Sequence, residues 1–325
     1  MKRFIFLAVM VVAFGVGPNA RAETAARPVW IDTDPICTGI GRSDDIDDCW
    51  ALLYALASPE LAVRGISTVF GNAEGPSAYE NTKDLIARFA TARGRPAPPI
   101  HAGASVAIGT TPTLSAGAAA LAEALGAEPL TILALGPLTN VAQMLRVKPD
   151  LARRIVRIVA VAGTRAGQTM LFPGSSRIVH LHDFNFKKDP KAFSAVLERE
   201  IEIVLTPFEA AQTMTMTRAD LGRIAQAGPV GAFLAEISRN WLGFWEQEFK
   251  APGFHPFDVL AVGYAVDPAA LACAPMTARV LFQQSLIVPR TSLEVAEKGA
   301  GRRVTYCTAV APAFKEHLFE RLRAG

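Results

Sequence analysis

Beyond its first 22 residues the sequence contains no run of 18 apolar residues, so nothing there predicts a membrane-spanning helix. It also lacks a Lys/Arg stripe interleaved with aromatic side chains, and its formal net charge is only +3. Both absences argue against a nucleic-acid or anionic-membrane partner. Charged residues make up 19% of the chain and hydrophobic residues 50%, a balance that excludes intrinsic disorder and allows a sizeable buried core.

The first 22 residues have the three parts of a secretory signal peptide. Two basic residues are followed by an apolar stretch from Phe4 to Val16, and Ala20-Arg21-Ala22 supplies a cleavage site. The stretch is shorter than the roughly 20 residues that span a bilayer, which argues against a stable membrane anchor. Residues 1–22 carry three basic residues and no acidic one, so the remainder is balanced in charge. We expect an exported protein, periplasmic in a Gram-negative cell, with one domain over residues 23–325.

Cysteines are few, and none lies in a C-x-x-C pair, which argues against a zinc knuckle or a thioredoxin-like centre. Export permits disulfides because the compartments outside the cytosol are oxidising. Two disulfides could join the four cysteines in three different pairings, and the sequence does not choose among them. These cysteines are Cys37, Cys49, Cys273 and Cys307.

Short β-branched or apolar runs alternate with segments of helical periodicity, and no repeat or long linker interrupts them. This alternation predicts an α/β fold, an open doubly wound structure with a mostly parallel central sheet and helices on both faces. The expected strands are Val29–Asp32, Ala62–Phe70, Leu130–Leu135, Ile155–Val161 and Ile201–Leu205. The expected helices are Cys49–Ala57, Ala78–Ala92, Leu138–Leu145 and one that follows Asp189-Pro190. In such sheets ligands bind beyond the carboxyl ends of the strands.

Acidic residues are concentrated after the first expected strand, in Asp32-Thr33-Asp34-Pro35 and Asp44-Asp45-Ile46-Asp47-Asp48. Carboxylates this close repel one another unless a cation lies among them. Calcium meets that need because it accepts six to eight oxygen ligands, whereas magnesium requires stricter octahedral geometry. Capping of the next helix accounts for Asp44 and Asp45, but not for Asp32 and Asp34 at a strand end. A metal site is therefore favoured.

These acidic segments resemble the inosine-uridine nucleoside hydrolase family, in which an Asp-Thr-Asp-Pro-Gly stretch, one further residue and Asp-Asp open a helix. Asp32-Thr33-Asp34-Pro35 and Asp47-Asp48-Cys49-Trp50-Ala51-Leu52 match the two halves. Between them stands a longer connection, residues Ile36–Ile46, which we call the insertion. Three further similarities are Phe70-Gly71-Asn72, Leu133–Asn140 and Asp258–Val262; a fourth is Asp183-Phe184-Asn185-Phe186, where Asp183 replaces the family's Glu.

The resemblance implies hydrolysis of the N-glycosidic bond of ribonucleosides with Ca2+ as cofactor. It implies that Asp34 is both metal ligand and general base, and that Asp48, the Leu135 carbonyl and Asp258 are the other protein ligands. It implies that Asp32 and Asp47 orient the ribose hydroxyls or support the metal ligands. The residues that it implies hold the sugar are Asn72, Asp183 and Asn185.

The side of the site that serves the leaving base departs from the family. Many members place His directly before the last ligand Asp, whereas Phe257 stands there in this chain. His255 is a candidate acid, although a lone His beside Pro and Phe is more often structural. Trp245 is a candidate for stacking on the base, but Trp241, Phe244 and Trp245 have the spacing of a core-facing helical stripe. Arg177 stands where the family's 5′-hydroxyl-binding Asn aligns.

Alternative functions remain open. Asp32-x-Asp34 after a strand is also typical of haloacid-dehalogenase-type phosphatases, which use magnesium. His180-x-His182 allows a zinc site, with no supporting His elsewhere. A non-catalytic exported nucleoside-binding protein is compatible with the missing His. Base preference and oligomeric state, dimer or tetramer included, are not fixed by the sequence.

Overall fold

The computed structural model describes residues 25–89, 96–165, 170–171, 178–179, 183–283 and 290–323. Residues 1–22, for which a signal peptide is predicted, lie outside this part of the chain, as do Arg177, His180 and His182.

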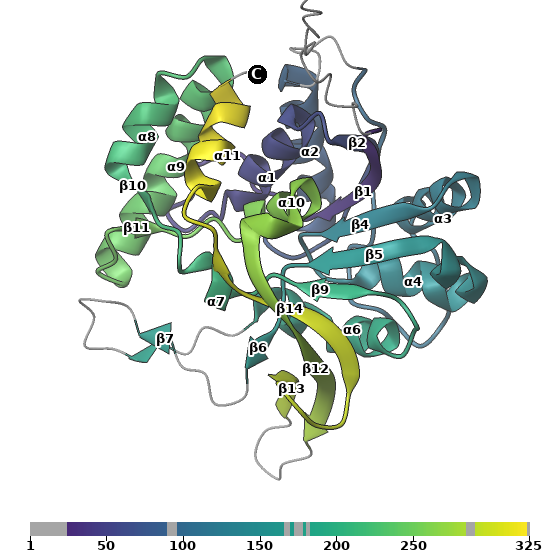
Figure 1. The fold of residues 1–325 in the computed structure, drawn as a ribbon. Coiled ribbons are helices and arrows are strands. Elements are labelled where there is room, and N and C mark those ends of the chain that lie inside the picture. Colours follow the sequence, from purple (N-terminus) through teal and green to yellow (C-terminus); the bar gives the residue numbers. More distant parts are fainter. Residues whose placement is uncertain are drawn as a thin grey trace, which may run out of the picture.

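A ten-stranded sheet forms the centre of the fold, in the order β3-β2-β1-β4-β5-β9-β14-β12-β13-β6 (Figure 1). From β3 to β14 every pair of neighbours is parallel, and β12 pairs antiparallel with both β14 and β13. The strands of this sheet are β1 (Arg27–Thr33), β2 (Leu61–Thr68), β3 (Ile100–His101), β4 (Leu130–Ala134), β5 (Ile155–Ala160), β6 (Thr164–Arg165), β9 (Ile203–Leu205), β12 (Leu271–Gln283), β13 (Arg290–Ala296) and β14 (Arg302–Val310). Two small sheets pair β7 (Met170–Leu171) with β8 (Ile178–Val179), and β10 (Met216–Thr217) with β11 (Gly253–Phe254).

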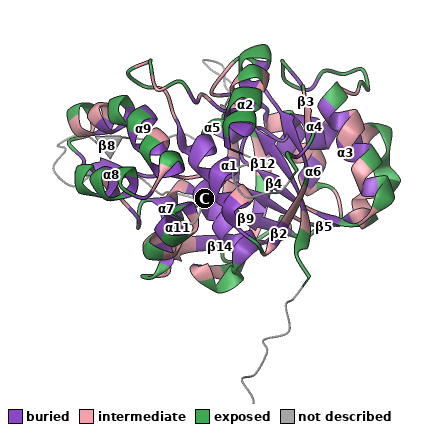
Figure 2. Ribbon diagram, turned by 90° about the horizontal axis from the view of Figure 1, so that it is seen from above, coloured by how far each residue is buried: buried purple, intermediate pink, exposed green. Residues whose placement is uncertain are grey.

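Helices cover both faces of the sheet, as Figures 1 and 2 show. Helices α3 (Ala116–Ala127), α4 (Thr139–Val147) and α6 (Pro190–Leu197) pack on one face. The other face is covered by α1 (Asp47–Ala57), α2 (Gly75–Phe89), α8 (Arg218–Ala225), α9 (Pro229–Glu248), α10 (Val259–Val266) and α11 (Phe314–Arg323). Short helices α5 (Phe184–Lys188) and α7 (Phe208–Ala211) and 3-10 turns η2 (Pro149–Arg154) and η3 (Pro268–Ala270) complete the described elements.

The central strands are buried on both faces because successive side chains point to opposite sides of a sheet. In β1, Val29 and Ile31 belong to the core under α1 and α10, whereas Trp30 belongs to the core under α3 and α4. In β4, Leu133 and Ile132 divide in the same way. These strands therefore read as continuous apolar runs, which is why the sequence predicts them well.

The predicted α/β fold with a mostly parallel sheet and helices on both faces is confirmed. Each expected strand and helix is present, with ends shifted by at most three residues among the described positions. The expected strand Ala62–Phe70 ends at Thr68, and the Phe70 amide instead donates to the Ala104 carbonyl at 2.9 Å. The antiparallel strands β12, β13 and β14 were not predicted, because partly exposed strands lack the continuous apolar runs of the central strands.

The cysteine pairing that the sequence left open is Cys37 with Cys49 and Cys273 with Cys307. The second disulfide joins paired positions of β12 and β14, and the first joins the insertion to α1. Among the helices of the described ranges, none has the length and apolar character that crossing a bilayer requires.

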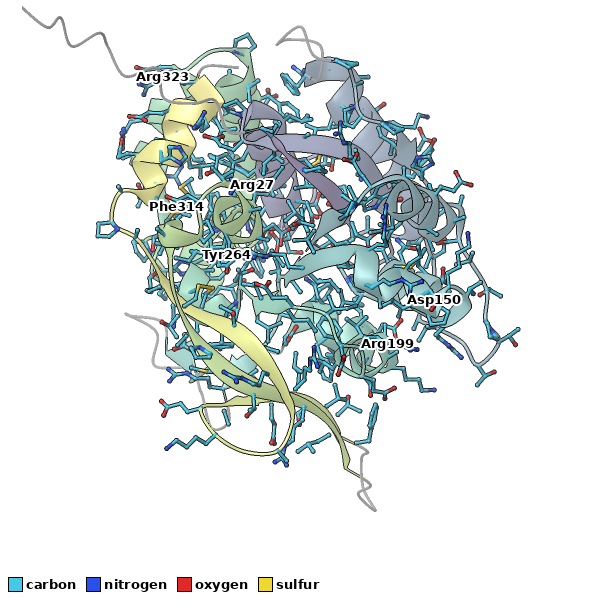
Figure 3. All side chains as sticks on the ribbon, turned by 45° about the vertical axis from the view of Figure 1, so that its right-hand side comes forward. Arg27, Asp150, Arg199, Tyr264, Phe314 and Arg323 are labelled. Carbon is cyan, nitrogen blue, oxygen red and sulfur yellow. A yellow bond between two sulfur atoms is a disulfide. The ribbon has the colours of Figure 1, made fainter. Side chains whose placement is uncertain are left out.

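Gly263 of α10 provides a test of the packing between α10 and α11. Figure 3 labels Phe314 of α11 and Tyr264, the residue that follows Gly263, and a methyl group at position 263 would overlap the Phe314 ring. We expect Gly263→Ala to destabilise the protein by about 1–3 kcal/mol through overpacking. Thermal unfolding should show a melting temperature several degrees lower.

The control is Gly222→Ala in α8, where an added Cβ meets nothing within 4 Å. It should be neutral or stabilising by up to about 1 kcal/mol, since Ala loses less backbone entropy in a helix than Gly. Equal melting temperatures for the two variants would contradict the proposed packing.

Candidate active site and metal centre

Five aspartates meet beyond the carboxyl end of β1, and together we call them the acidic site. Asp32 and Asp34 come from the end of β1, Asp47 and Asp48 from the first turn of α1, and Asp258 from the start of α10. Each is at most 3% exposed. The sheet edge thus brings together residues more than 200 positions apart, at the place where ligands of parallel sheets bind.

Asp34 has one bound and one bare carboxylate oxygen. The Asn72 amide donates to Oδ2 at 2.6 Å, whereas the buried Oδ1 accepts no hydrogen bond from the described residues. The backbone approaches this carboxylate so closely that a Cβ at Gly71 would overlap Oδ2 and one at Gly136 would lie 2.8 Å from Oδ1. Burial, and then the charge of Asp48, raises the pKa of Asp34 well above its usual range.

Asp48 links the two acidic segments. Its Oδ1 accepts from the Thr33 hydroxyl and from the Asp34 amide, the latter at 3.2 Å, and its Oδ2 accepts from Asn72 Nδ2 at 3.2 Å. Burial, followed by the charge of Asp47, raises the pKa of Asp48 to about 6 despite these donors. Asn72 therefore contacts both candidate metal ligands, Asp34 and Asp48, and holds them in place. This role is additional to its predicted contact with the sugar.

Oxygens of Asp47, Asp48 and Asp258 lie within 4.8 Å of one another, close enough to hold one metal ion. Asp47 Oδ2 also accepts from the amides of Phe257 at 2.8 Å and Asp258 at 3.2 Å, which ties the start of α1 to the start of α10. The geometry thus adds Asp47 to the donors available to a metal, beside the predicted Asp48 and Asp258.

Asp44 does not cap α1, contrary to prediction. The N-cap residue is Ile46, and Asp44 instead accepts from the Gly41 amide at 2.8 Å and the Thr38 hydroxyl at 3.2 Å within the insertion. Asp45 does contact the helix start, since its Oδ1 lies 3.4 Å from the Asp47 amide nitrogen. The capping prediction is therefore wrong for Asp44, whose carboxylate accepts hydrogen bonds within a turn of the insertion, and agrees with the contact made by Asp45.

Asp32 of the acidic site is oriented by a hydrogen-bond network that the sequence did not reveal. Its Oδ1 accepts from Ser67 Oγ at 2.5 Å and from Asn140 Nδ2 at 2.7 Å, while the buried Oδ2 has no hydrogen-bond partner among the described residues. Burial raises the pKa of Asp32 to about 7. Asn140 ends the Leu133–Asn140 motif, so its presence was noted, but its contact with Asp32 depends on tertiary structure.

Asn185 joins two strand ends behind the acidic site. Its Nδ2 donates to the Leu135 carbonyl at 2.6 Å and to the Val161 carbonyl at 3.0 Å. The predicted ligand carbonyl of Leu135 is therefore already bound by one donor, and a carbonyl oxygen has a second lone pair for a metal. Asp183 caps α5 through the Phe186 amide at 3.0 Å and accepts from the Gly163 amide at 2.6 Å. Burial raises the pKa of Asp183 to about 6.

His255 and Trp245 lie in a buried aromatic cluster beside Phe257. Trp245 is 2% exposed and His255 is 7% exposed. The His255 ring meets Trp245 and Phe208 edge to face, at centroid distances of 5.1 and 5.7 Å, and its Nδ1 lies 2.9 Å from the Met214 carbonyl oxygen. Burial lowers the pKa of His255, which keeps the ring neutral. Burial in this cluster is what the structural alternative predicts, in which His255 and Trp245 serve the core and not the substrate.

The donors of the acidic site fit a hard divalent cation. All of these donors are oxygens. Two buried ones, Asp34 Oδ1 and Asp32 Oδ2, lack a hydrogen-bond partner in the described part of the chain. The hydrogen bonds that the carboxylates of Asp32 and Asp34 accept from the described residues come from Ser67, Asn140 and the Asn72 amide, and none comes from a basic side chain. Buried carboxylates held this close are stable as anions only with a compensating charge. Oxygen-only donors are the ligands that calcium and magnesium prefer.

Comparisons with known proteins find relatives that are ribonucleoside hydrolases. The non-specific ribonucleoside hydrolase RihC of Escherichia fergusonii is 25% identical over 289 residues, which covers 82% of this chain and 88% of that protein. The pyrimidine-specific ribonucleoside hydrolase RihA of an Enterobacter species is 29% identical over 259 residues, covering 71% and 75%. The structure of a purine-preferring ribonucleoside hydrolase from Gardnerella vaginalis superposes with a TM-score of 0.74 at 19% identity, covering 92% of this chain and 98% of that one.

The sequence profile of a family described as inosine-uridine preferring nucleoside hydrolase matches residues 29–315. This match spans β1 to α11 and includes every residue of the acidic site, so it leaves the phosphatase alternative without support. The chain belongs to the inosine-uridine preferring nucleoside hydrolase family of enzymes, as its acidic motifs predict.

Proposed function

We propose that the protein hydrolyses the N-glycosidic bond of ribonucleosides, to free base and ribose, with calcium bound in the acidic site. One observation carries the proposal: two buried carboxylate oxygens without a hydrogen-bond partner among the described residues, Asp34 Oδ1 and Asp32 Oδ2, lie in a cluster of five aspartates at the carboxyl end of a parallel strand. Calcium is preferred over magnesium because it accepts more oxygens in looser geometry, sugar hydroxyls included.

Asp34, Asp48, Asp258 and the Leu135 carbonyl would hold the ion, and the position of Asp47 allows it to contribute. The bound ion supplies positive charge that stabilises the carboxylates and a Lewis acid for water and ribose hydroxyls. Asp34 would accept the proton of the attacking water, because its buried Oδ1 accepts no hydrogen bond from the described residues. The Asn72 amide fixes Asp34 through Oδ2 and leaves Oδ1 facing the site.

The ribose would bind against Asp32, Asp47, Asn72, Asp183 and Asn185. Its hydroxyls donate to carboxylates and accept from amides, and every one of these side chains carries such a group. Orientation of the sugar matters because cleavage passes through an oxocarbenium-like state that forms only when water and leaving base are aligned. Arg177, which lies outside the described residues, remains a candidate for the 5′ end.

The departing base needs a proton, and His255 is the proposed donor, with Trp245 proposed to stack on the base. Phe257 supports a place for the base nearby, because its amide contacts Asp47 and its ring packs 5.2 Å from Phe208. For His255 to serve, the segment between Phe254 and Asp258 would have to rearrange when substrate binds, so that the ring leaves the burial that lowers its pKa and can take up a proton.

Export is part of the proposal. Two disulfides among the described residues support it, since structural disulfides are rare in the cytosol. The signal-peptide features of residues 1–22 support it independently. An exported hydrolase of this kind would release bases and ribose from nucleosides outside the cytosol.

The function is tested with inosine, uridine, adenosine and cytidine, each incubated with the purified chain in calcium and in excess chelator. We expect free base and ribose in calcium and a loss of at least about 100-fold in rate after chelation. Restored activity after calcium is added back is the control for unfolding. Nucleosides that bind but are not cleaved would show a binding protein instead, and phosphate release from p-nitrophenyl phosphate would show a phosphatase.

Asp34→Asn tests the general base. Removing the proton acceptor and one metal ligand should lower kcat by at least about 100-fold and weaken calcium binding measured by calorimetry. Asp44→Asn is the matched control, since the same change falls on a neighbouring carboxylate that serves only the insertion. Near-normal turnover by Asp34→Asn would exclude the proposed base.

His255→Asn tests the leaving-group acid with two substrates. If His255 protonates the base, kcat for inosine should fall about 100-fold, whereas p-nitrophenyl riboside should be cleaved almost normally, because a nitrophenolate leaves without protonation. A parallel fall for both substrates, together with a lower melting temperature, would assign His255 to the core instead.

A further inference from the structure

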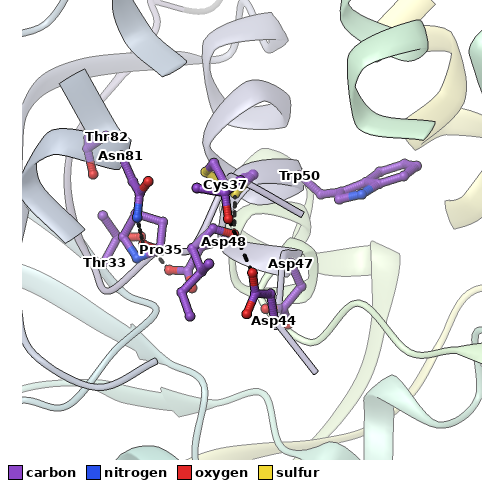
Figure 4. The surroundings of a disulfide bond; sticks show 12 residues. Thr33, Pro35, Cys37, Asp44, Asp47, Asp48, Trp50, Asn81 and Thr82 are labelled. Carbon is purple, nitrogen blue, oxygen red and sulfur yellow. Dashed lines mark hydrogen bonds between the residues drawn. A yellow bond between two sulfur atoms is a disulfide. The ribbon is translucent and has the colours of Figure 1, made fainter. Parts of the chain in front are cut away.

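The disulfide Cys37–Cys49 lies directly beside the acidic site. Cys49 follows Asp48 in the first turn of α1, and Cys37 stands three residues after Asp34, so the bonded cysteines are 12 positions apart in the sequence. Figure 4 shows Cys37 next to Asp48, with Thr33 and Pro35 close by. The cross-link thus joins the segment that carries Asp34 to the segment that carries Asp47 and Asp48.

In the described part of the chain, few hydrogen bonds join the start of α1 to the end of β1, although the helix also packs in the core and Asp47 ties it to α10. Its N-cap residue is Ile46, whose side chain cannot accept the hydrogen bond that normally fixes a first turn. The hydrogen bonds that the described residues form there are those of Asp48 with Thr33, with the Asp34 amide and with Asn72, and all of them use the carboxylate that is to bind metal.

The insertion packs against α9, away from the acidic segments that it connects. Gly39 has a positive φ of 61° and packs so tightly on Ile237 of α9 that a Cβ would overlap its backbone. Asn240 donates to the Gly39 carbonyl at 2.9 Å, and Arg42 forms an ion pair with Glu248 at 2.6 Å. Since the insertion is anchored on α9, the peptide chain between Pro35 and Asp47 is too long to keep the two acidic segments in register by itself.

We propose that Cys37 and Cys49 are positioning residues of the metal centre, and that their disulfide maintains the geometry in which the acidic site binds its cation. This inference rests on the proposed calcium site. The carboxylates repel one another without the ion, so the metal-free site tends to open, and the cross-link limits how far the start of α1 can move from Asp34. Calcium affinity therefore depends on the oxidation state of one cysteine pair.

Calorimetric calcium titration of the full mature chain tests this directly. We expect Cys37→Ser/Cys49→Ser to bind calcium at least about tenfold more weakly than the wild type, and to regain most of its kcat at saturating calcium, since the ligands themselves are intact. The matched control is Cys273→Ser/Cys307→Ser, which removes the disulfide between β12 and β14 and should bind calcium with wild-type affinity.

A redox titration keeps the proposal testable if the first variant folds poorly. In the control variant Cys37–Cys49 is the remaining disulfide of the described chain, and a dithiol reduces it by transferring two electrons and two protons, becoming a cyclic disulfide itself. Linkage is reciprocal, so a tenfold effect on affinity requires calcium to make this disulfide harder to reduce by about 30 mV.

The outcomes separate the two proposals. Equal calcium affinity with and without the Cys37–Cys49 bond, or a reduction potential that calcium does not move, would overturn the positioning role alone. A wild-type chain that binds no calcium would overturn the metal site and the positioning role together.

Discussion

Burial of several carboxylates in one place is the constraint on which the site depends. Asp32, Asp34, Asp47, Asp48 and Asp258 are all nearly inaccessible, and burial is the first cause of the raised pKa of each. Backbone amides and the side chains of Asn72 and Asn140 donate to them, yet such neutral donors offset only part of the cost of burying a charge. These carboxylates therefore need a further positive charge to be stable as anions, and the cluster is arranged so that a cation could supply it.

The N-terminal ends of α1 and α10 stabilise the buried carboxylates, but by less than burial of the charges costs. Asp47 and Asp48 lie in the first turn of α1 and Asp258 lies at the N-cap of α10, where the free amides favour negative charge. Such an interaction stabilises a carboxylate by about 0.3–1 kcal/mol, up to about 2 kcal/mol when partly buried. Burial of an ion costs several kcal/mol even after the protein relaxes. A divalent ion among the carboxylates offers a much larger compensation, which explains why the fold gathers donors from three elements.

Sequence patterns predicted the parts of the structure that are local or continuous. The apolar runs of β1, β4 and β5 and the acidic segments around Asp34 and Asp48 are legible because each lies within a few consecutive residues. Contacts between distant residues were not predictable in this way. The Asn140 bond to Asp32 spans 108 positions, and the choice between Cys49 and the other partners of Cys37 depends on where the insertion packs. The antiparallel β12–β14 region escaped prediction because its strands are partly exposed and end outside the core.

The site has two halves, one with the candidate metal ligands, which we call the metal half, and one near His255. Different interactions hold the residues of each half in place, which explains why the first resembles the family closely and the second departs from it. The metal half is built from strand ends, helix starts and glycines whose positions leave no room for a side chain, as at Gly71 and Gly136. Any substitution there displaces the Asp34 carboxylate. The half near His255, Trp245 and Phe257 is built from side-chain packing within an aromatic cluster, where rings of similar volume can replace one another at modest cost. A residue such as Phe257 can therefore stand in place of His without disturbing the metal half, because its contact with Asp47 is made by its backbone amide, which every residue except proline provides.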